Sequence, residues 1–235
     1  MANYMVHTCK SRQWYVDEFL IPSLLEQGAD DRDIEVVCDT EEKGTLQMYV
    51  TSFEKCGVEP YGTWHLQDDI ILCRDFVERT EALDNGLVCG LCTTYDKNKD
   101  QCGDVRAKDM WYSFPCIRIP NYIAGQFAKW FYDVAVKDKQ FRVYIGTRKH
   151  EDFLFKQFVQ DYFPDVPAIN VKPNLIDHID FLIGGSLVNK TRKEEQVRSL
   201  YWEDEQLVDQ LVDRLFDRLQ PEEVYRHAEN TAPTK

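Results

Sequence analysis

The first third of the chain alternates between short apolar segments and helical patterns, and this alternation constrains the fold more than any other feature. Segments 4–8, 34–38 and 62–66 have the length and composition of strands. Between them, 12–27 and 45–56 carry apolar side chains at helical spacing. Strand, helix and strand in this order predict parallel strands joined by right-handed crossovers. We therefore expect an α/β fold with a doubly wound sheet.

The rest of the chain continues this mixed pattern. The periodicity predicts strands at 87–93, 113–119 and 141–145, helices at 121–136 and 151–163, and a loop at 95–108. Segment 204–219 predicts an amphipathic helix, because one face carries Leu207, Val208, Leu211, Val212, Leu215, Phe216 and Leu219. We expect one domain over 1–200, followed over 201–235 by this helix and a tail; the helix packs on the domain or pairs with a second copy.

Charge and hydropathy disfavour several classes of protein. With 41 acidic and 28 basic residues, the net charge of -13 argues against a broad nucleic-acid-binding surface. Basic groups at 142–149 and 190–198 leave a local contact with phosphates open. No segment approaches the roughly 20 apolar residues of a membrane-spanning helix, and 1–4 lacks the pattern of a secretory signal. A cytoplasmic protein is expected, in the host cytoplasm if it is viral.

The eight cysteines fit a reducing compartment, so no disulfides are expected. The tightest group is Cys89, Cys92, Cys102 and Cys116. It contains one short-spaced pair of the kind that binds zinc, but the second pair of a zinc ribbon is missing. Zinc binding by this group therefore stays open.

The most informative segment is 64–72, where Asp68 and Asp69 end one apolar strand and a second apolar run begins at once. An aspartate pair at a strand end often only shapes a turn. It can also hold a divalent cation while a substrate diphosphate supplies further oxygen ligands. Ligands of doubly wound sheets bind beyond the carboxyl ends of the strands. His7, Thr8 and Asp39 fall at such ends as well.

Two further segments carry candidate chemistry. In 172–179, His178 is followed by Gly184, Gly185 and Ser186, which are typical of a turn or of main-chain N–H groups that approach a phosphate. Lys190 and Arg192 could neutralise the charge of a departing nucleotide. Glu151 and Asp152 stand in the first turn of a predicted helix, where acids ordinarily cap the helix or favour its dipole.

These segments resemble the GT-A glycosyltransferases. The run Leu-Gln-Asp-Asp-Ile at 66–70, followed by Asp75 and Phe76, is similar to the Leu-Glu-Asp-Asp-Val motif of lipopolysaccharide-type members, with Gln67 in place of the first acid. The run ending at His178 is similar to a Pro-Ser-Leu-Val-Gln-His pattern of several GT-A families. The resemblance covers the order of elements over 3–195. At the level of motifs it is restricted to these two segments and, weakly, the helix at Glu151.

The resemblance implies a GT-A fold, a Rossmann-like mixed sheet flanked by helices. It further implies a metal-dependent hexosyl- or pentosyltransferase like the small bacterial or phage enzymes, with a nucleotide diphosphate-sugar as donor and a UDP-sugar favoured. Asp69 and His178 would be the metal ligands, with Mn²⁺ preferred to Mg²⁺ because imidazole suits manganese better. Asp152 is the first choice of base and Glu151 the second. The donor-binding residues would be His7, Thr8, Asp39, Gln67, Asp68, Gly184, Gly185, Ser186, Lys190 and Arg192.

The acceptor and two other classes of function stay open. The acidic charge favours a glycan acceptor, whereas the local basic groups keep hydroxymethylated DNA in consideration. A nucleotidyltransferase would usually carry a glycine-rich basic loop after the first strand, and 7–12 has basic residues but no glycine. A non-catalytic assembly protein would use 204–219 for pairing, as a homodimer for example, and would bind neither Mn²⁺ nor a nucleotide sugar.

Overall fold

The structure is a computed structural model of the 235-residue chain. It describes residues 3–56, 61–83, 86–90, 102–110, 112–146 and 151–179, together with residues 183, 206, 210, 211, 213 and 214.

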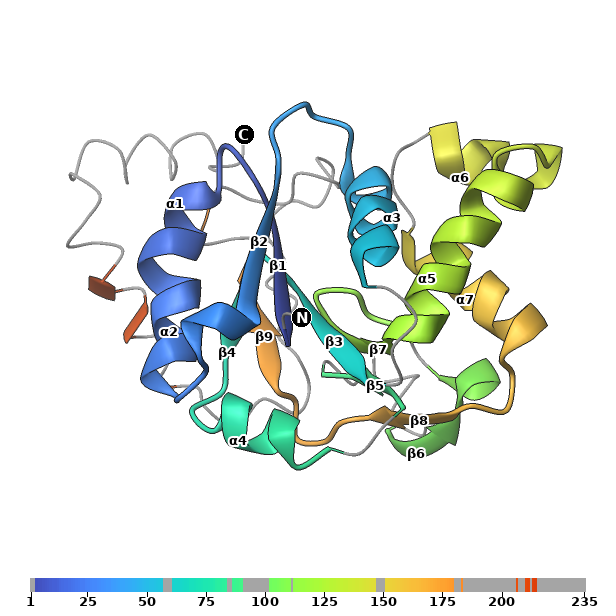
Figure 1. Ribbon diagram of the computed structural model, residues 1–235. Coiled ribbons are helices and arrows are strands. Elements are labelled where there is room, and N and C mark those ends of the chain that lie inside the picture. Colours follow the sequence, from blue (N-terminus) through green and yellow to red (C-terminus); the bar gives the residue numbers. More distant parts are fainter. Residues whose placement is uncertain are drawn as a thin grey trace, which may run out of the picture.

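A seven-stranded mixed sheet forms the centre of the molecule (Figure 1). Strand β1 is parallel to both β2 and β3, as the strand, helix and strand order predicts. Antiparallel pairing of β3 with β7 then makes the sheet mixed. Across the sheet the strands are β2 (Ile34–Asp39), β1 (Tyr4–Cys9), β3 (Gly62–Gln67), β7 (Cys116–Pro120), β5 (Leu87–Cys89), β8 (Pro167–Asn170) and β6 (Gly103–Arg106). The expected α/β class is confirmed, with a Rossmann-like arrangement.

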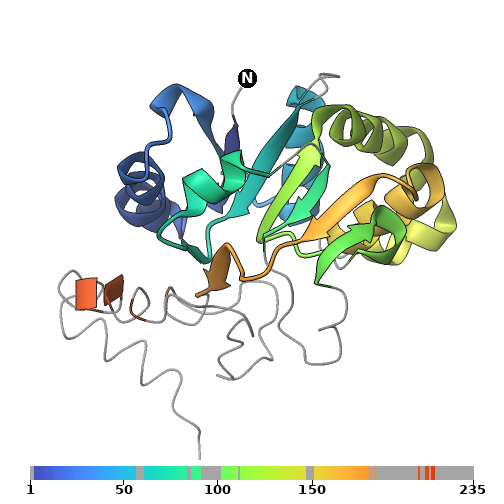
Figure 2. The same cartoon turned by 90° about the horizontal axis from the view of Figure 1, so that it is seen from below.

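Helices cover both faces of this sheet, as the view from below shows (Figure 2). One face packs against α3 (Thr45–Lys55), α5 (Asn121–Trp130) and α7 (Glu151–Tyr162). The other packs against a continuous helical segment formed by α1 (Gln13–Tyr15), the π-helical turn η1 (Val16–Leu20) and α2 (Ile21–Glu26), and against α4 (Phe76–Glu81). The predicted helices at 12–27, 45–56 and 151–163 are confirmed. The helix expected at 121–136 is α5 continued by a second π-helical turn, η5 (Phe131–Ala135).

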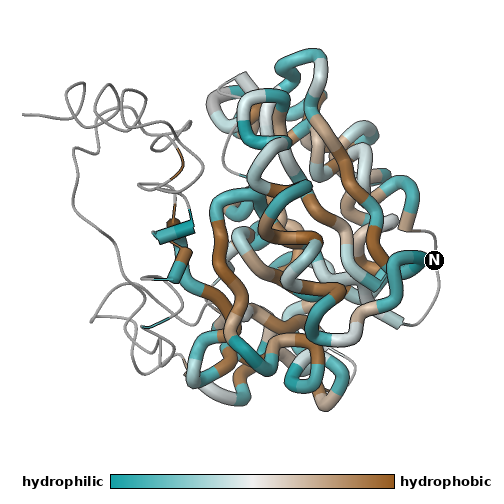
Figure 3. Tube along the Cα trace, turned by 90° about the vertical axis from the view of Figure 1, so that its left-hand side faces the viewer, coloured by the Kyte–Doolittle hydropathy of each residue, from teal (hydrophilic) through white to brown (hydrophobic). Residues whose placement is uncertain are grey.

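Side chains of β1 alternate between the two faces. Met5 belongs to the core under α3, α5 and α7, whereas Tyr4 and Val6 belong to the core under α1 and α2. The tube view shows apolar stretches along the interior of the fold and polar residues at the turns (Figure 3). The period of two therefore decides which residue of each strand faces which helical layer.

A small second sheet lies beside the α1 and α2 layer and brings two distant parts of the sequence together. Strand β4 (Ile70–Leu72) pairs antiparallel with β9 (Ile176–His178), and Ile70 is opposite His178. Because β4 directly follows Asp69, its pairing with β9 brings His178 close to Asp69.

Two predicted segments differ in the structure. The strand expected at 141–145 is instead a 3-10 turn, η6 (Lys139–Phe141), followed by α6 (Arg142–Gly146). The signal for a helix is Asp138, whose carboxylate accepts a hydrogen bond from the N–H of Gln140 at 2.9 Å and so caps the turn. Phe141 then packs edge-on against Trp130, with 5.2 Å between the ring centroids.

The loop expected at 95–108 contains a strand in its described part. Strand β6 pairs with β8 at the edge of the sheet, and a 3-10 turn, η4 (Ala107–Asp109), follows it. Asp104 and Arg106 are exposed and alternate with half-buried neighbours. An edge strand tolerates polar side chains, so the hydropathy pattern of 95–108 did not predict β6.

The remaining expectations are tested only in part. Of the strand expected at 87–93, the part Leu87–Cys89 is confirmed, and 91–93 lies outside the described residues. Most of 204–219 lies outside them too; of its described residues, Leu211 is buried in the core under α1 and α2. Among the described residues, no helix is long and apolar enough to cross a membrane.

The expectation of no disulfides is wrong, because Cys102 is disulfide-bonded. The other six described cysteines form no disulfide bond. Cys89 and Cys116 are among them and are buried in the sheet. Cys92 lies outside the described residues.

The packing on α7 yields a stability prediction. Phe155 is fully buried and contacts Phe127 at 5.3 Å between ring centroids, whereas Phe153 on the same helix is 56% exposed. We expect Phe155→Ala to lower the free energy of unfolding by about 3–5 kcal/mol, because it leaves a cavity in an aromatic cluster. Phe153→Ala is the matched control and should cost less than about 1 kcal/mol. Urea unfolding of both variants checks this, and equal losses would contradict the packing described.

Candidate functional site

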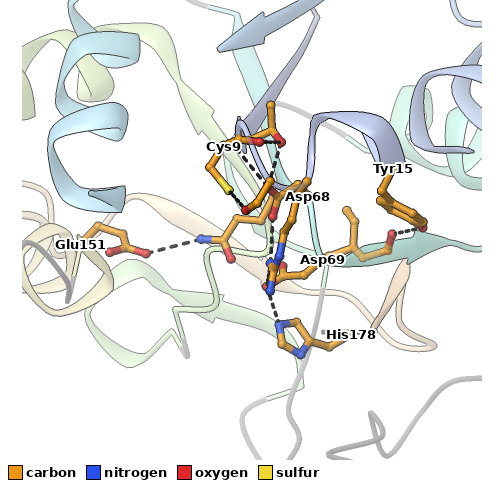
Figure 4. Close-up of polar contacts among 11 residues, drawn as sticks. Cys9, Tyr15, Asp68, Asp69, Glu151 and His178 are labelled. Carbon is orange, nitrogen blue, oxygen red and sulfur yellow. Dashed lines mark hydrogen bonds and ion pairs between the residues drawn. The ribbon is translucent and has the colours of Figure 1, made fainter. Parts of the chain in front are cut away.

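The candidate site lies where β1 and β3 end, and the alternation along β3 divides it in two. Gln67 faces the α3 and α7 layer, where it contacts Glu151. Asp68, one residue later, faces the α1 layer, where it contacts Arg12. Figure 4 shows Glu151 on one side of the aspartate pair and Tyr15 on the other.

Asp68 is held by three donors, two from the end of β1 and one from the turn that follows it. Its Oδ2 accepts hydrogen bonds from the hydroxyl of Thr8 at 2.8 Å and from the backbone N–H of Cys9 at 3.3 Å. Its Oδ1 accepts one from a terminal guanidinium nitrogen of Arg12 at 3.0 Å. Burial raises the pKa of Asp68 and the adjacent Asp69 raises it further, against the opposing effects of Arg12 and Thr8.

Asp69 lies between Arg12 and His178. Its Oδ2 accepts a hydrogen bond from the same nitrogen of Arg12 at 3.0 Å and lies 3.3 Å from Nε2 of His178. Its Oδ1 is buried and has no hydrogen-bond partner among the described residues. Burial by itself would raise the pKa of Asp69, but His178 and Arg12 outweigh it and hold this pKa well below its usual range.

The position of His178 is set by the main chain. Its strand β9 pairs with β4, and the backbone N–H of Ile179 donates to the carbonyl oxygen of Asp69 at 2.8 Å. The two residues predicted as metal ligands therefore come together, although the sequence separates them widely.

The sequence analysis did not single out Arg12 as a site residue. The residue is only 3% exposed, and it follows β1 in a tight turn in which the N–H of Arg12 donates to the carbonyl of Cys9 at 3.0 Å. Its guanidinium bridges Asp68 and Asp69. The available signal was a basic residue four positions after the end of a strand that was itself expected to end at the site.

Glu151 is the acid of the α7 N-terminus that reaches the site. The hydroxyl of Thr45 donates to its Oε2 at 2.8 Å, and the amide of Gln67 donates to its Oε1 at 3.4 Å. Burial raises the pKa of Glu151 to about 7. Asp152, the first choice as base, instead accepts the backbone N–H of Phe153 at 2.8 Å on the exposed side of the helix.

His7 lies in the core instead of the expected donor-binding position. It is 1% exposed because odd-numbered residues of β1 face α3. Its Nε2 lies 3.0 Å from Nδ1 of His65, and its ring stacks on Tyr49 with 4.1 Å between centroids. Burial lowers the pKa of His7, and that of His65 to about 3, so both rings are neutral.

Asp39, also expected at the donor, shapes the loop that leads into α3. Its two carboxylate oxygens accept the N–H groups of Lys43 at 2.9 Å and Gly44 at 2.8 Å. Gly44 has a φ of 90°, which favours glycine at this position. Asp39 also lines a small cavity of about 120 Å³. The remaining predicted donor-binding residues, Gly184, Gly185, Ser186, Lys190 and Arg192, lie outside the described residues.

Asp69 and His178 fit a shared cation. Two neighbouring ligands that each lie about 2.1 Å from an octahedral ion are roughly 3 Å apart, close to the 3.3 Å between Oδ2 and Nε2 here. The buried Oδ1 adds an oxygen that is still open to coordination. Groups of three or more His, Cys, Asp or Glu residues suited to a metal do not occur among the described residues, so the site offers a cation two ligands from this part of the chain.

Neither a scan against protein-family models nor a search of the curated proteins finds a match to this chain.

The raised pKa of Glu151 predicts a pH-dependent stability. With a folded pKa of about 7 against an ordinary 4.5, protonated Glu151 stabilises the fold below about pH 4.5, and this contribution is lost as the pH rises through about 7. Glu151→Gln should therefore match the wild type near pH 4.5 and exceed its free energy of unfolding by about 2 kcal/mol at pH 8.

Urea unfolding at pH 4.5, 6 and 8 measures this effect. Asp152→Asn, at the neighbouring half-buried acid, is the control and should follow the wild-type dependence. A Glu151→Gln curve parallel to that of the wild type would show that burial does not raise the pKa of Glu151.

Proposed function

We propose that the protein is a metal-dependent glycosyltransferase of the GT-A type, which transfers a sugar from a nucleotide diphosphate-sugar to an acceptor hydroxyl. The observation that carries this proposal is the approach of His178 Nε2 to Asp69 Oδ2, at 3.3 Å, beyond the carboxyl ends of β1 and β3. Such ends are where sheets of this class bind their ligands. A UDP-sugar is the favoured donor, and a hexose or pentose the group transferred.

Asp69 and His178 would hold the divalent cation, with Mn²⁺ preferred to Mg²⁺ because one ligand is an imidazole. The bound cation supplies Lewis acidity that offsets the charge developing on the leaving diphosphate. Asp68, which Thr8, Cys9 and Arg12 hold in place, would contact the donor sugar and ribose. Gly184, Gly185, Ser186, Lys190 and Arg192 remain the candidates for the diphosphate.

Glu151 is our choice of base for an inverting transfer. It lies across Gln67 from the aspartate pair, and Thr45 fixes one of its oxygens. A pKa of about 7 leaves a large part of Glu151 ionised at neutral pH and still basic enough to accept the proton of an acceptor hydroxyl. Asp152 lacks this position, so the structure favours the acid that the sequence ranked second.

We further propose that the enzyme acts in the cytoplasm and that 204–219 joins two copies or packs on the domain. The net charge of -13 favours a glycan as acceptor over hydroxymethylated DNA. Transfer to hydroxymethylated DNA that falls steeply with salt would favour the second acceptor.

Donor binding is the direct test of the metal assignment. In a thermal-shift panel of nucleotide sugars, we expect one donor to raise the Tm with Mn²⁺ present and much less without it. Asp69→Ala and His178→Ala should each abolish this Mn²⁺-dependent shift and lower transfer by at least about 10³-fold, because the cation loses one of its two protein ligands.

Asp75→Asn removes an exposed carboxylate a few residues further on and serves as the control. It should leave both the shift and transfer unchanged. Full activity of both Asp69→Ala and His178→Ala would exclude a metal at this position.

The assignment of the base is tested by comparing the two neighbouring acids. Glu151→Gln should lower kcat by about 10²–10⁴-fold while the Kd of the donor changes little, because proton removal is lost and donor contacts are kept. Asp152→Asn should retain most of the activity. The wild-type rate should rise with pH through about 7, as Glu151 loses its proton. An equal loss in both variants, or a rate that is flat across this range, would remove Glu151 as the base.

A further inference from the structure

Asp68 and Asp69 share one cationic nitrogen. The same terminal nitrogen of Arg12 lies 3.0 Å from an oxygen of each carboxylate. The side chain of Arg12 is 4% exposed, and those of Asp68 and Asp69 are 10% and 14% exposed. Two adjacent anions with so little access to water repel each other strongly, so this guanidinium is their counter-ion.

Arg12 also occupies the carboxylate oxygen of Asp69 that His178 faces. Oδ2 of Asp69 faces both Arg12 at 3.0 Å and His178 at 3.3 Å. A divalent ion that binds Asp69 and His178 therefore meets a second positive charge on its own ligand. It can bind only against this repulsion, or after Arg12 has given up its bond to Asp69. The bond from Arg12 to Asp68 does not have to break, because it uses a different carboxylate.

We infer that Arg12 couples cation binding to diphosphate binding. Its guanidinium supplies the positive charge beside Asp69 until a diphosphate binds, and the metal then supplies it. This inference rests on the proposed function. The diphosphate adds negative charge that offsets the crowding of two cations, and it offers the guanidinium a new anionic partner. A guanidinium suits this exchange because it stays charged and has several donors in fixed positions. Arg12 is thus a positioning residue that makes the empty site a poor metal site and the donor-loaded site a good one.

A purely structural role for Arg12 predicts something different. If Arg12 only neutralises two buried carboxylates, its removal lowers stability and disorders the ligands, so Mn²⁺ binds less tightly or equally. If Arg12 competes with the cation, its removal tightens the binding of Mn²⁺ alone. The sign of the change in affinity therefore separates the two roles.

The experiment measures the Kd of Mn²⁺ by isothermal titration calorimetry, for the metal alone and in the presence of UDP. For Arg12→Gln we expect Mn²⁺ alone to bind about tenfold more tightly than to the wild type, and the tightening caused by UDP to be smaller by about the same factor. Arg32→Gln is the matched control, because Arg32 pairs with Asp30 at an exposed site and should leave both values unchanged.

Arg12→Gln leaves two carboxylates without their counter-ion, so a second pair of variants covers the case in which it does not fold. Arg12→Gln combined with Asp68→Asn removes one charge of each sign, and Asp68→Asn alone is its reference. The double variant should bind Mn²⁺ alone about tenfold more tightly than the reference. Binding that is equal or weaker in the Arg12 variants overturns the inference, even where the wild type binds Mn²⁺ and transfers sugar. Absence of Mn²⁺ binding in every protein, with and without UDP, overturns both the inference and the proposed metal site.

Discussion

The ion pairs between Arg12 and the consecutive carboxylates Asp68 and Asp69 are the interaction on which the site depends. Removing two anions from water costs several kcal/mol unless a cation and hydrogen-bond donors replace the solvent. The chain provides them from two short segments, the end of β1 with the turn that follows it and the strand β9. The charge of the pair thereby ties together the ends of β1, β3 and β9.

The pleat of β3 gives this arrangement two chemically distinct sides. Gln67 and Asp68 are neighbours in the sequence and point into different helical layers. On one side Arg12 and His178 lower the pKa of Asp69 and favour its charge. On the other, burial raises the pKa of Glu151 and disfavours its charge. Two consecutive residues at the end of β3, Gln67 and Asp68, thus face one environment that disfavours the charge of a carboxylate and one that favours it.

Much of the fold could be predicted from the sequence, because each helix and strand of the first third has the periodicity of its own element. The meeting of Asp69 with His178 was also predicted, through a resemblance of motifs. Arg12 was not, since its role comes from the turn after Cys9, which folds it back under the aspartates. The same limit applies to His7 and to the choice between Glu151 and Asp152. In each case one residue of register decides between core and site, and composition does not specify register. The helix at α6 was missed because a capping aspartate outweighed β-type side chains.

The backbone pairing of β4 with β9 also bears on how such a site changes in evolution. His178 is positioned beside Asp69 by the three residue pairs of β4 and β9 and by the hydrogen bond from the N–H of Ile179 to the carbonyl oxygen of Asp69. Main-chain hydrogen bonds tolerate the exchange of most side chains, provided that the segment still forms a strand. Descendants of a common ancestor can therefore keep Asp69 and His178 in this register while nearly every neighbouring residue changes. Distant relatives should therefore be recognised better by the spacing and pairing of these two strands than by their amino-acid sequence.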